Sequence, residues 1–145
     1  MISLRCATPM DAERLFAWRN DALTRQNSRN TDEVPWDTHV SWLLDSLARE
    51  DRLLLIGEYE GVAMGTVRFD RRGSHQEASW TAAPEMRCKG LAKQMVVTAR
   101  RLIPANIVAE IRVDNAPSIK ISEACGFACV GSHDDFCTWH RASVY

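Results

Sequence analysis

The sequence lacks the features that would place the protein in a membrane or a secretory pathway. No apolar run approaches the roughly 20 residues that a bilayer-spanning helix needs, and the first five residues contain no hydrophobic signal segment. The net charge is −1, so nothing favours a general attraction to nucleic acid or to membranes. We therefore expect a cytoplasmic protein with neither kind of partner.

The cysteines lack the spacing of a metal site or a disulfide framework. They are odd in number and form no C-x-x-C pair, which leaves free, reduced thiols as the expectation. We predict no metal cofactor. The five cysteines are Cys6, Cys88, Cys125, Cys129 and Cys137.

Repeats, low-complexity tracts and obvious linkers are also missing. The 145 residues are 46% hydrophobic and 26% charged, as in ordinary globular proteins. This length is enough for one domain with a real core. We predict a single domain over residues 1–145.

Two common phosphate-binding motifs are absent, but a third arrangement takes their place. There is no P-loop and no dinucleotide fingerprint with three glycines. Instead, a strand-like run leads through a turn at Gly90 into a helical run, with Arg87, Lys89 and Lys93 close by. Unpaired amides and the positive dipole end at the start of a helix favour anions. The stretch predicts an anion site, although a basic helix start that binds nothing would look the same.

The apolar patterns predict an alternation of strands and helices. A polar, irregular connection at 21–36 separates the first two helices, Thr8 is a good N-cap, and Asp37 is expected to cap the second helix. Glu60-Gly61 and Arg71-Arg72-Gly73 are typical of turns. The expected strands are 2–6, 52–59, 62–69, 74–83, 107–113 and one or two over 127–131 and 136–145; the expected helices are 9–20, 37–49, 91–103 and 115–126. This order predicts a mixed α/β sheet with helices on both faces.

Two motifs in this order carry a resemblance to a known family. Arg87-x-x-Gly90-x-Ala92 and, further on, Asn115-x-x-Ser118 followed by Gly126-Phe127 resemble the signatures of the GNAT acetyltransferases. With the strand order, the resemblance covers residues 2–131. It implies a mostly antiparallel sheet of six to seven strands, and acetyl transfer from acetyl-CoA to an amine without a metal.

The resemblance also implies where the cofactor would bind. The pyrophosphate would lie on the amides of residues 87–93, the pantetheine beside residues 80–83, and the distal arm near Asn115 and Ser118. The alternative for Asn115 is a helix cap alone, a role that Asn often has. The implied cofactor residues are Trp80, Thr81, Ala82, Ala83, Arg87, Cys88, Lys89, Gly90, Leu91, Ala92, Lys93, Asn115 and Ser118.

Amine acetylation needs a base, because amines are largely protonated at neutral pH. Family members often use a Glu on the fourth strand, which corresponds to Glu77 here, and His75 lies two residues earlier on the same face. Either could instead be a solvent-facing strand residue. Ser122 stands where many members have the Tyr that protonates the leaving thiolate, and a serine is a poor acid.

The acceptor is expected to meet residues of the first two helices. The pattern Trp18-Arg19-Asn20, followed by Trp36-x-x-His39-x-x-Trp42, resembles the branch that acetylates nucleotide-linked amino sugars, as in the pseudaminic acid pathway, with the ribosomal-protein N-acetyltransferases as relatives. Trp42 could stack on a sugar or pack in the core, and the arginines could meet a diphosphate or only the solvent. The predicted substrate-binding residues are Arg19, Asn20, Arg29, His39 and Trp42.

Three functions remain open at this point. The first is N-acetylation of a small primary amine, with an amino sugar nucleotide as the best candidate. The second is acetylation of a protein N-terminus or lysine. The third is a non-catalytic acyl-CoA-binding homologue, a reading that the serine at position 122 supports. Either a monomer or a homodimer fits the sequence.

Overall fold

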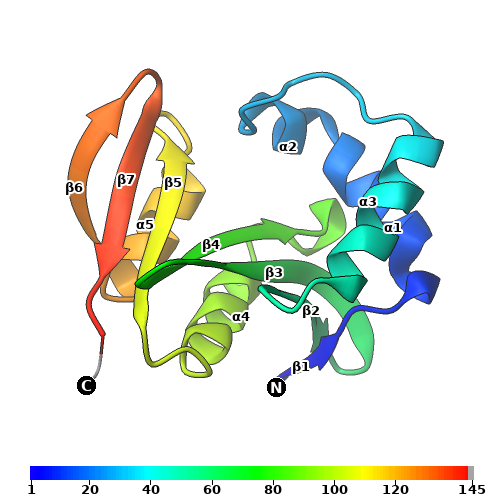
Figure 1. Cartoon of the computed structure of the whole chain (residues 1–145), viewed down its shortest axis with the longest axis horizontal. Coiled ribbons are helices and arrows are strands. Elements are labelled where there is room, and N and C mark those ends of the chain that lie inside the picture. Colours follow the sequence, from blue (N-terminus) through cyan, green and yellow to red (C-terminus); the bar gives the residue numbers. More distant parts are fainter. Residues whose placement is uncertain (144–145) are drawn as a thin grey trace.

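The computed structural model describes residues 1–143 and contains a seven-stranded sheet in the order β1-β2-β3-β4-β5-β7-β6. All neighbouring strands are antiparallel except β4 and β5. Figure 1 shows the helices on both sides of this sheet. The predicted mixed α/β fold is confirmed. The strands are β1 (Ile2–Cys6), β2 (Arg52–Tyr59), β3 (Val62–Arg72), β4 (His75–Ala82), β5 (Asn106–Arg112), β6 (Ala128–His133) and β7 (Phe136–Arg141).

The helices follow the predicted order, with one addition. They are α1 (Ala12–Asn20), α2 (Ala22–Gln26), α3 (Trp36–Ala48), α4 (Leu91–Arg100) and α5 (Ala116–Ala124), with short 3-10 turns η1 (Pro9–Asp11) and η2 (Pro84–Met86). The last strand was expected to reach residue 145, and residues 144–145 lie outside the described part of the chain. Among residues 1–143, no helix is long and apolar enough to cross a bilayer.

Of the predictions for the N-terminal helices, one is confirmed and two are wrong. Thr8 forms a capping box with Asp11, as its position suggested. The prediction that Asp37 caps the next helix is wrong, because α3 begins one residue earlier behind the extended Pro35. The expectation that 21–36 is irregular throughout is also wrong, since Asp21 accepts a hydrogen bond from the Thr24 amide (3.1 Å) and starts α2.

The turn after β3 is shorter than predicted. Arg71 and Arg72 pair with Gln76 and His75, so β3 continues to Arg72 instead of ending at Phe69. Gly73, with a φ of 62°, takes the left-handed conformation that the tight turn requires. The longer hairpin extends the face of β3 that carries Arg68 and Asp70.

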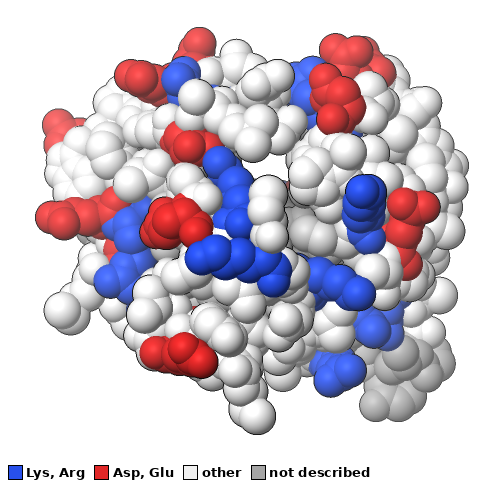
Figure 2. Space-filling view, turned by 180° about the vertical axis from the view of Figure 1, so that it is seen from behind, with Lys and Arg blue, Asp and Glu red and all other residues white. Residues whose placement is uncertain are grey.

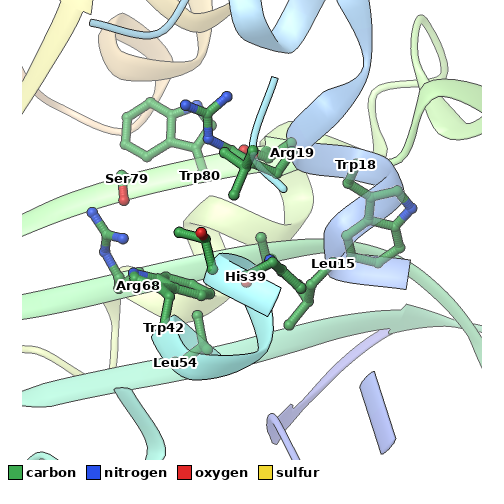
Figure 3. Close-up of a pocket in the computed structure, with 13 residues that line it drawn as sticks. Leu15, Trp18, Arg19, His39, Trp42, Leu54, Arg68, Ser79 and Trp80 are labelled. Carbon is green, nitrogen blue, oxygen red and sulfur yellow. The ribbon is translucent and has the colours of Figure 1, made fainter. Parts of the chain in front are cut away.

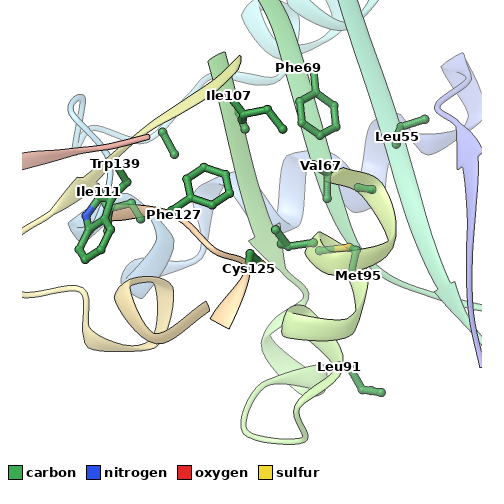
Figure 4. Close-up of a cluster of buried hydrophobic side chains, with 14 of the residues drawn as sticks. Leu55, Val67, Phe69, Leu91, Met95, Ile107, Ile111, Cys125, Phe127 and Trp139 are labelled. Carbon is green, nitrogen blue, oxygen red and sulfur yellow. The ribbon is translucent and has the colours of Figure 1, made fainter. Parts of the chain in front are cut away.

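The two faces of the sheet pack against different helices. One face of the sheet forms the larger apolar core with α4 and α5, where Val67 and Phe69 of β3 are buried with Met95 of α4 (Figure 4). The opposite face packs Leu54 and Ile56 of β2 against α1 and α3. The alternation of side chains along each strand produces this division.

Helix α4 lies very close to the sheet because two strand residues have no side chain. A Cβ on Gly57 would lie 2.6 Å from Met95 Sδ, and a Cβ on Gly65 would lie 3.0 Å from Met95 Cε and 2.6 Å from the Thr81 carbonyl oxygen of β4. Real Cβ atoms do not approach so closely, so these glycines permit the contact. They fix α4 against β2, β3 and the end of β4.

Strands β4 and β5 separate after a short parallel contact. Only three residue pairs join them, from His75–Asn106 to Glu77–Val108. Beyond this point the two strands diverge in Figure 1. From Ala78 to Ala82, that edge of β4 has no strand partner among the described residues. The sheet therefore contains an open edge in its middle.

Candidate active site

A cavity of about 300 Å³ lies between the open half of β4 and the helices α1 and α3 (Figure 3). Its walls come from both helices, the loop before α3, and strands β2, β3 and β4. The lining residues are Leu15, Trp18, Arg19, Val34, Thr38, His39, Trp42, Leu54, Thr66, Arg68, Ser79, Trp80 and Thr81.

The sheet forms the floor of this cavity through its register. Arg68 of β3 lies opposite Ser79 of β4, and Thr66 lies opposite Thr81. Cross-strand partners share a face, so four polar side chains meet on the side that α1 and α3 cover. Arg68 was not among the predicted site residues, although an arginine between the buried Val67 and Phe69 signals a strand with one polar face.

Arg19 of α1, which the sequence predicts as a substrate contact, lines the cavity. One terminal nitrogen donates to the Asn30 carbonyl oxygen (3.0 Å), whereas the other, Nη1, is buried without a hydrogen-bond partner in the described part of the chain. Burial lowers the pKa of Arg19, and the positive charge of Arg25 adds to the effect. The guanidinium is therefore poorly solvated and uncompensated.

Arg68 has a similar environment on the floor. Its Nε lies 3.3 Å from Asp70 Oδ2 but is buried without a hydrogen bond among residues 1–143. Asp70 already accepts two hydrogen bonds from Arg52 (2.6 and 3.3 Å). Burial lowers the pKa of Arg68, while the Asp70 charge acts in the opposite direction.

His39 and Trp42 share one face of α3, as their spacing predicted, and their rings stack at a centroid distance of 5.9 Å. His39 is 3% exposed, and its Nε2–H donates to the Ala12 carbonyl oxygen (2.9 Å). Burial lowers the pKa of His39 below its ordinary 6.5. His39 is thus a neutral ring that ties α3 to α1.

Two other predicted acceptor residues do not line the cavity. Asn20 hydrogen-bonds to both the carbonyl oxygen and the amide of Val34 (2.9 and 2.8 Å), so it holds the loop that carries Val34 into the wall. Arg29 pairs with Glu110 of β5, and its guanidinium lies over the ring of Phe136 (4.1 Å). Arg29 therefore connects the α2–α3 loop to the far part of the sheet.

The predicted anion site lies where β4 leads through η2 into α4. Cys88 and Gly90 have φ values of 64° and 73°, so the chain turns sharply and the helix begins without a side-chain cap. Lys89 and Lys93 are exposed and have no ion pair among the described residues. Leu91, the first residue of α4, is buried and Ala92 is half-buried. Free amides and two unpaired cations thus surround the helix start.

The side chain of Arg87 points to another element. Its guanidinium donates to Oδ2 of Asp21, the N-cap of α2 (2.6 Å), and to Oγ1 of Thr24 within α2 (3.1 Å). This hydrogen bond is the main cause that lowers the pKa of Asp21. Arg87 therefore joins the turn before α4 to the helices beside the cavity, a contact across 66 sequence positions.

Positive charge also gathers on the surface seen from behind. Figure 2 shows Lys and Arg side chains in a band across this face, next to a hollow. The net charge of the chain is only −1, so the band is a local feature. Such a band raises the local concentration of anions.

The other predicted cofactor residues lie along the open edge of β4 and at the start of α5. Trp80 packs edge-to-face on Phe127 (6.3 Å between ring centroids), and Ala83 is fully buried. Asn115 is the N-cap of α5 and accepts from the Ser118 amide (3.4 Å). Asn115 thus has the structural role that the sequence left open.

The predicted catalytic residues occupy three different environments. Glu77 lies at the last pair between β4 and β5, next to the split, with its carboxylate 4.0 Å from Arg72. His75 is further from the split, and neither residue lines the cavity. Ser122 is fully buried and its hydroxyl has no partner in the described region. It could meet a thiolate only if the surrounding side chains moved.

The fold has many solved counterparts. They include YncA from Salmonella typhimurium, solved with acetyl-CoA (23% identity, 98% of this chain and 94% of that one, TM-score 0.77). An N-acetyltransferase from Staphylococcus aureus Mu50 is similar (22% identity, 98% of each chain, TM-score 0.78), as is the Vibrio cholerae spermidine N-acetyltransferase with CoA and spermine (15% identity, 96% and 92%, TM-score 0.81). At sequence identities of 23% or less, this similarity shows a shared fold and nothing about the function.

A sequence comparison is more specific. No curated protein sequence matches. The family model of the acetyltransferase (GNAT) domain matches residues 2–128, which span β1 to the start of β6 and include both motifs. The chain therefore belongs to the GNAT acetyltransferase family, and it is an acyltransferase that uses acetyl-CoA.

Proposed function

We propose that the protein moves the acetyl group of acetyl-CoA to a primary amine of a small molecule held in the cavity. One observation carries this proposal: Ser79, Trp80 and Thr81 belong both to the unpaired edge of β4 and to the cavity lining. A donor that pairs with this edge as an added strand would have its acyl end beside the acceptor.

The residues around the split fit the donor. Acetyl-CoA supplies an activated thioester, and the protein supplies the surface that holds it. The amides of residues 87–93 and the unpaired charges of Lys89 and Lys93 suit the pyrophosphate. The open backbone of Ala78–Ala82 suits the pantetheine amides, and Asn115 and Ser118 remain the proposed contacts of the distal arm.

Glu77 is the proposed base. It lies where β4 and β5 separate, on the face of β4 that also carries Ser79 and Thr81. A carboxylate there could take the amine proton directly or through water. His75 is the second candidate, one step further from the split, and the buried Ser122 would act only after local movement.

The cavity supports a small acceptor. A volume of about 300 Å³ lies at the low end of small-molecule pockets and leaves little room for an extended peptide. The spermidine N-acetyltransferase fold mate is solved with spermine, a small amine. Aromatic and arginine lining also suits an amino sugar nucleotide, with Trp42 against the sugar and Arg19 on the diphosphate. Asn20 and Arg29 would then shape the loop of this site.

Acetyl-CoA binding by a matched pair of variants tests the proposal. Wild-type protein at 100 times the dissociation constant should gain about 2.7 kcal/mol, a thermal shift of several degrees. Gly90→Asp and Gly90→Asn both tolerate the positive φ and differ mainly in charge. We expect Asp to weaken acetyl-CoA binding at least tenfold more than Asn. Equal affinities would mean that the pyrophosphate lies elsewhere, and no shift for the wild type would refute the proposed function.

A further inference from the structure

We infer that the acceptor amine carries an oxyanion group, a carboxylate or a phosphate, which Arg19 and Arg68 bind together in the cavity. This inference rests on the proposed function and names the substrate class of the same site. It concerns a contact that Arg68 would make, a residue with no predicted role in the sequence.

The wall of the cavity is positively charged. Of the described residues that line it, two are arginines, one is the neutral His39, and none is acidic. A purely cationic acceptor would therefore enter a site with two like charges and no counter-charge. Such an arrangement disfavours a polyamine, even though a fold mate of this chain is solved with spermine.

The two arginines of the cavity wall also have hydrogen-bond donors without a partner among residues 1–143. These donors, Arg19 Nη1 and Arg68 Nε, are both buried. A buried donor without a partner costs free energy, and the cost is larger for a charged group. Both side chains line the same small cavity, so an oxyanion held there would supply the counter-charge that these two buried guanidinium groups lack. The planar guanidinium is suited to carboxylate and phosphate oxygens.

The neighbouring carboxylates compensate Arg68 only in part: the charge of Glu77 also acts on Arg68, but its carboxylate lies 4.0 Å from Arg72. Asp70 accepts both hydrogen bonds of Arg52, and Arg72 Nη2 also lies 3.7 Å from it. Three arginines thus share one buried carboxylate, which leaves Arg68 incompletely neutralised. Within residues 1–143, the charge that acts on Arg19 is that of Arg25, and it is repulsive.

The direction of both side chains agrees with a shared ligand. Figure 3 shows the two guanidinium groups on the same side of the cavity, one above the β4 strand and one below, near Ser79. The opposite side of the cavity is apolar, with Leu15 and Trp18. A fitting acceptor therefore has an anionic end and a compact, less polar body.

Matched acceptor pairs test the inference and separate the two sources of an oxyanion. L-leucine against 3-methylbutylamine isolates a carboxylate, glucosamine 6-phosphate against glucosamine isolates a phosphate, and spermidine serves as the polycation. Binding is measured by titration calorimetry with CoA present, and turnover by thiol release. We expect the anionic member of one pair to bind at least tenfold more tightly than its partner. Equal binding within both pairs, or preference for spermidine, would overturn the inference.

Variants assign the effect to the two arginines. Arg19→Gln and Arg68→Gln should each raise the dissociation constant or KM of the acceptor that carries the oxyanion at least tenfold, and leave those of its partner amine without the oxyanion unchanged. Arg71→Gln, on the same strand as Arg68 but on the opposite face, is the control. Should a glutamine variant fail to fold, Arg19→Lys and Arg68→Lys are compared, which keep the charge but lose the planar fork.

The acetyl-CoA thermal shift separates this inference from the proposed function. The shift should persist in every arginine variant, because none of these side chains belongs to the proposed donor surface. Loss of the shift in the wild type refutes the proposed function. A normal shift with an unchanged anion preference in both arginine variants refutes only the inference.

Discussion

The two faces of the sheet differ in what holds their helices. On the face of α4 and α5, the contacts are apolar, and Val67, Met95 and Ile107 are completely buried. On the face of α1 and α3, a smaller apolar cluster is supplemented by buried polar groups, among them Asp11 and His39. Apolar burial does not depend on pH, whereas ion pairs and buried histidines do.

The polar contacts on the second face join different elements of the fold. Arg5 of β1 donates two hydrogen bonds to Asp11 (2.8 Å each). Arg52 of β2 joins Asp70 of β3 to Ser46 of α3 (2.8 Å to the hydroxyl). We infer that the face packed against α4 and α5 contributes most of the stability, whereas the face packed against α1 and α3 holds charged groups beside the cavity.

The largest expected effect is on the apolar face. Phe69→Ala removes a side chain that is 2% exposed in the main core, so it should cost about 3–5 kcal/mol of unfolding free energy. Ser79→Ala on the same hairpin but on the cavity face should change stability by less than about 0.5 kcal/mol. Urea denaturation at pH 7 and pH 5 measures both. The cost of Phe69→Ala should be the same at the two pH values, and a strong pH dependence would contradict the comparison.

A smaller, pH-dependent effect is expected at Asp11. The hydrogen bonds from Arg5 lower the pKa of Asp11 below its ordinary 3.8, with burial acting in the opposite direction. Because the folded pKa is the lower one, the ion pair stabilises the protein above about pH 4, and this contribution is lost as the pH falls through the folded pKa. Asp11→Asn should therefore cost roughly 1.5–3 kcal/mol at pH 7.

Acid titration of stability distinguishes this origin from simple packing. The unfolding free energies of wild type and Asp11→Asn should converge below pH 4. Asp45→Asn, an exposed carboxylate on α3 without an ion pair in the described region, is the control and should match the wild type throughout. A constant gap between wild type and Asp11→Asn would show that the charge is unimportant.

Local signals predicted much of the fold. The Glu60-Gly61 turn and the Thr8 cap were read correctly because each depends on a few adjacent residues. The prediction that Asp37 is the N-cap of α3 was wrong because the helix begins at Trp36, and its N-cap residue, Pro35, makes no side-chain hydrogen bond that the sequence could signal. Helix α2 was missed because it has five residues and is stabilised by Asp21, whose partner Arg87 is distant in sequence.

The candidate site was less predictable than the fold, for the same reason. His39, Trp42 and Arg19, three of the predicted substrate contacts, do line the cavity, and the helical spacing of His39 and Trp42 places both on one face of α3. Arg68 was missed because its role depends on β-sheet register, which aligns it with Ser79. Its lack of a partner depends on how Arg52 uses Asp70. Such pairings arise only when distant strands come together.

The smallest expected effect concerns His39, and it tests whether the cavity face responds to pH near neutrality. Burial lowers the folded pKa of His39 below its ordinary 6.5, and the hydrogen bond to Ala12 opposes this only in part. The unfolded chain then binds the proton more readily than the folded one. Stability should be complete above about pH 6.5 and should fall below it, by at most about 1.4 kcal/mol per pH unit, until the folded pKa is reached.

Replacement of His39 by Gln should remove this loss, because a glutamine amide can still donate to the Ala12 carbonyl oxygen but does not titrate. The measurement is urea denaturation of both proteins from pH 7.5 to pH 5.5. His133, whose side chain is 89% exposed, provides the control variant His133→Gln, which should retain the wild-type slope. If His39→Gln also retained that slope, the pH sensitivity would belong to another group, and the cavity face would be no more sensitive to neutral pH than the apolar face.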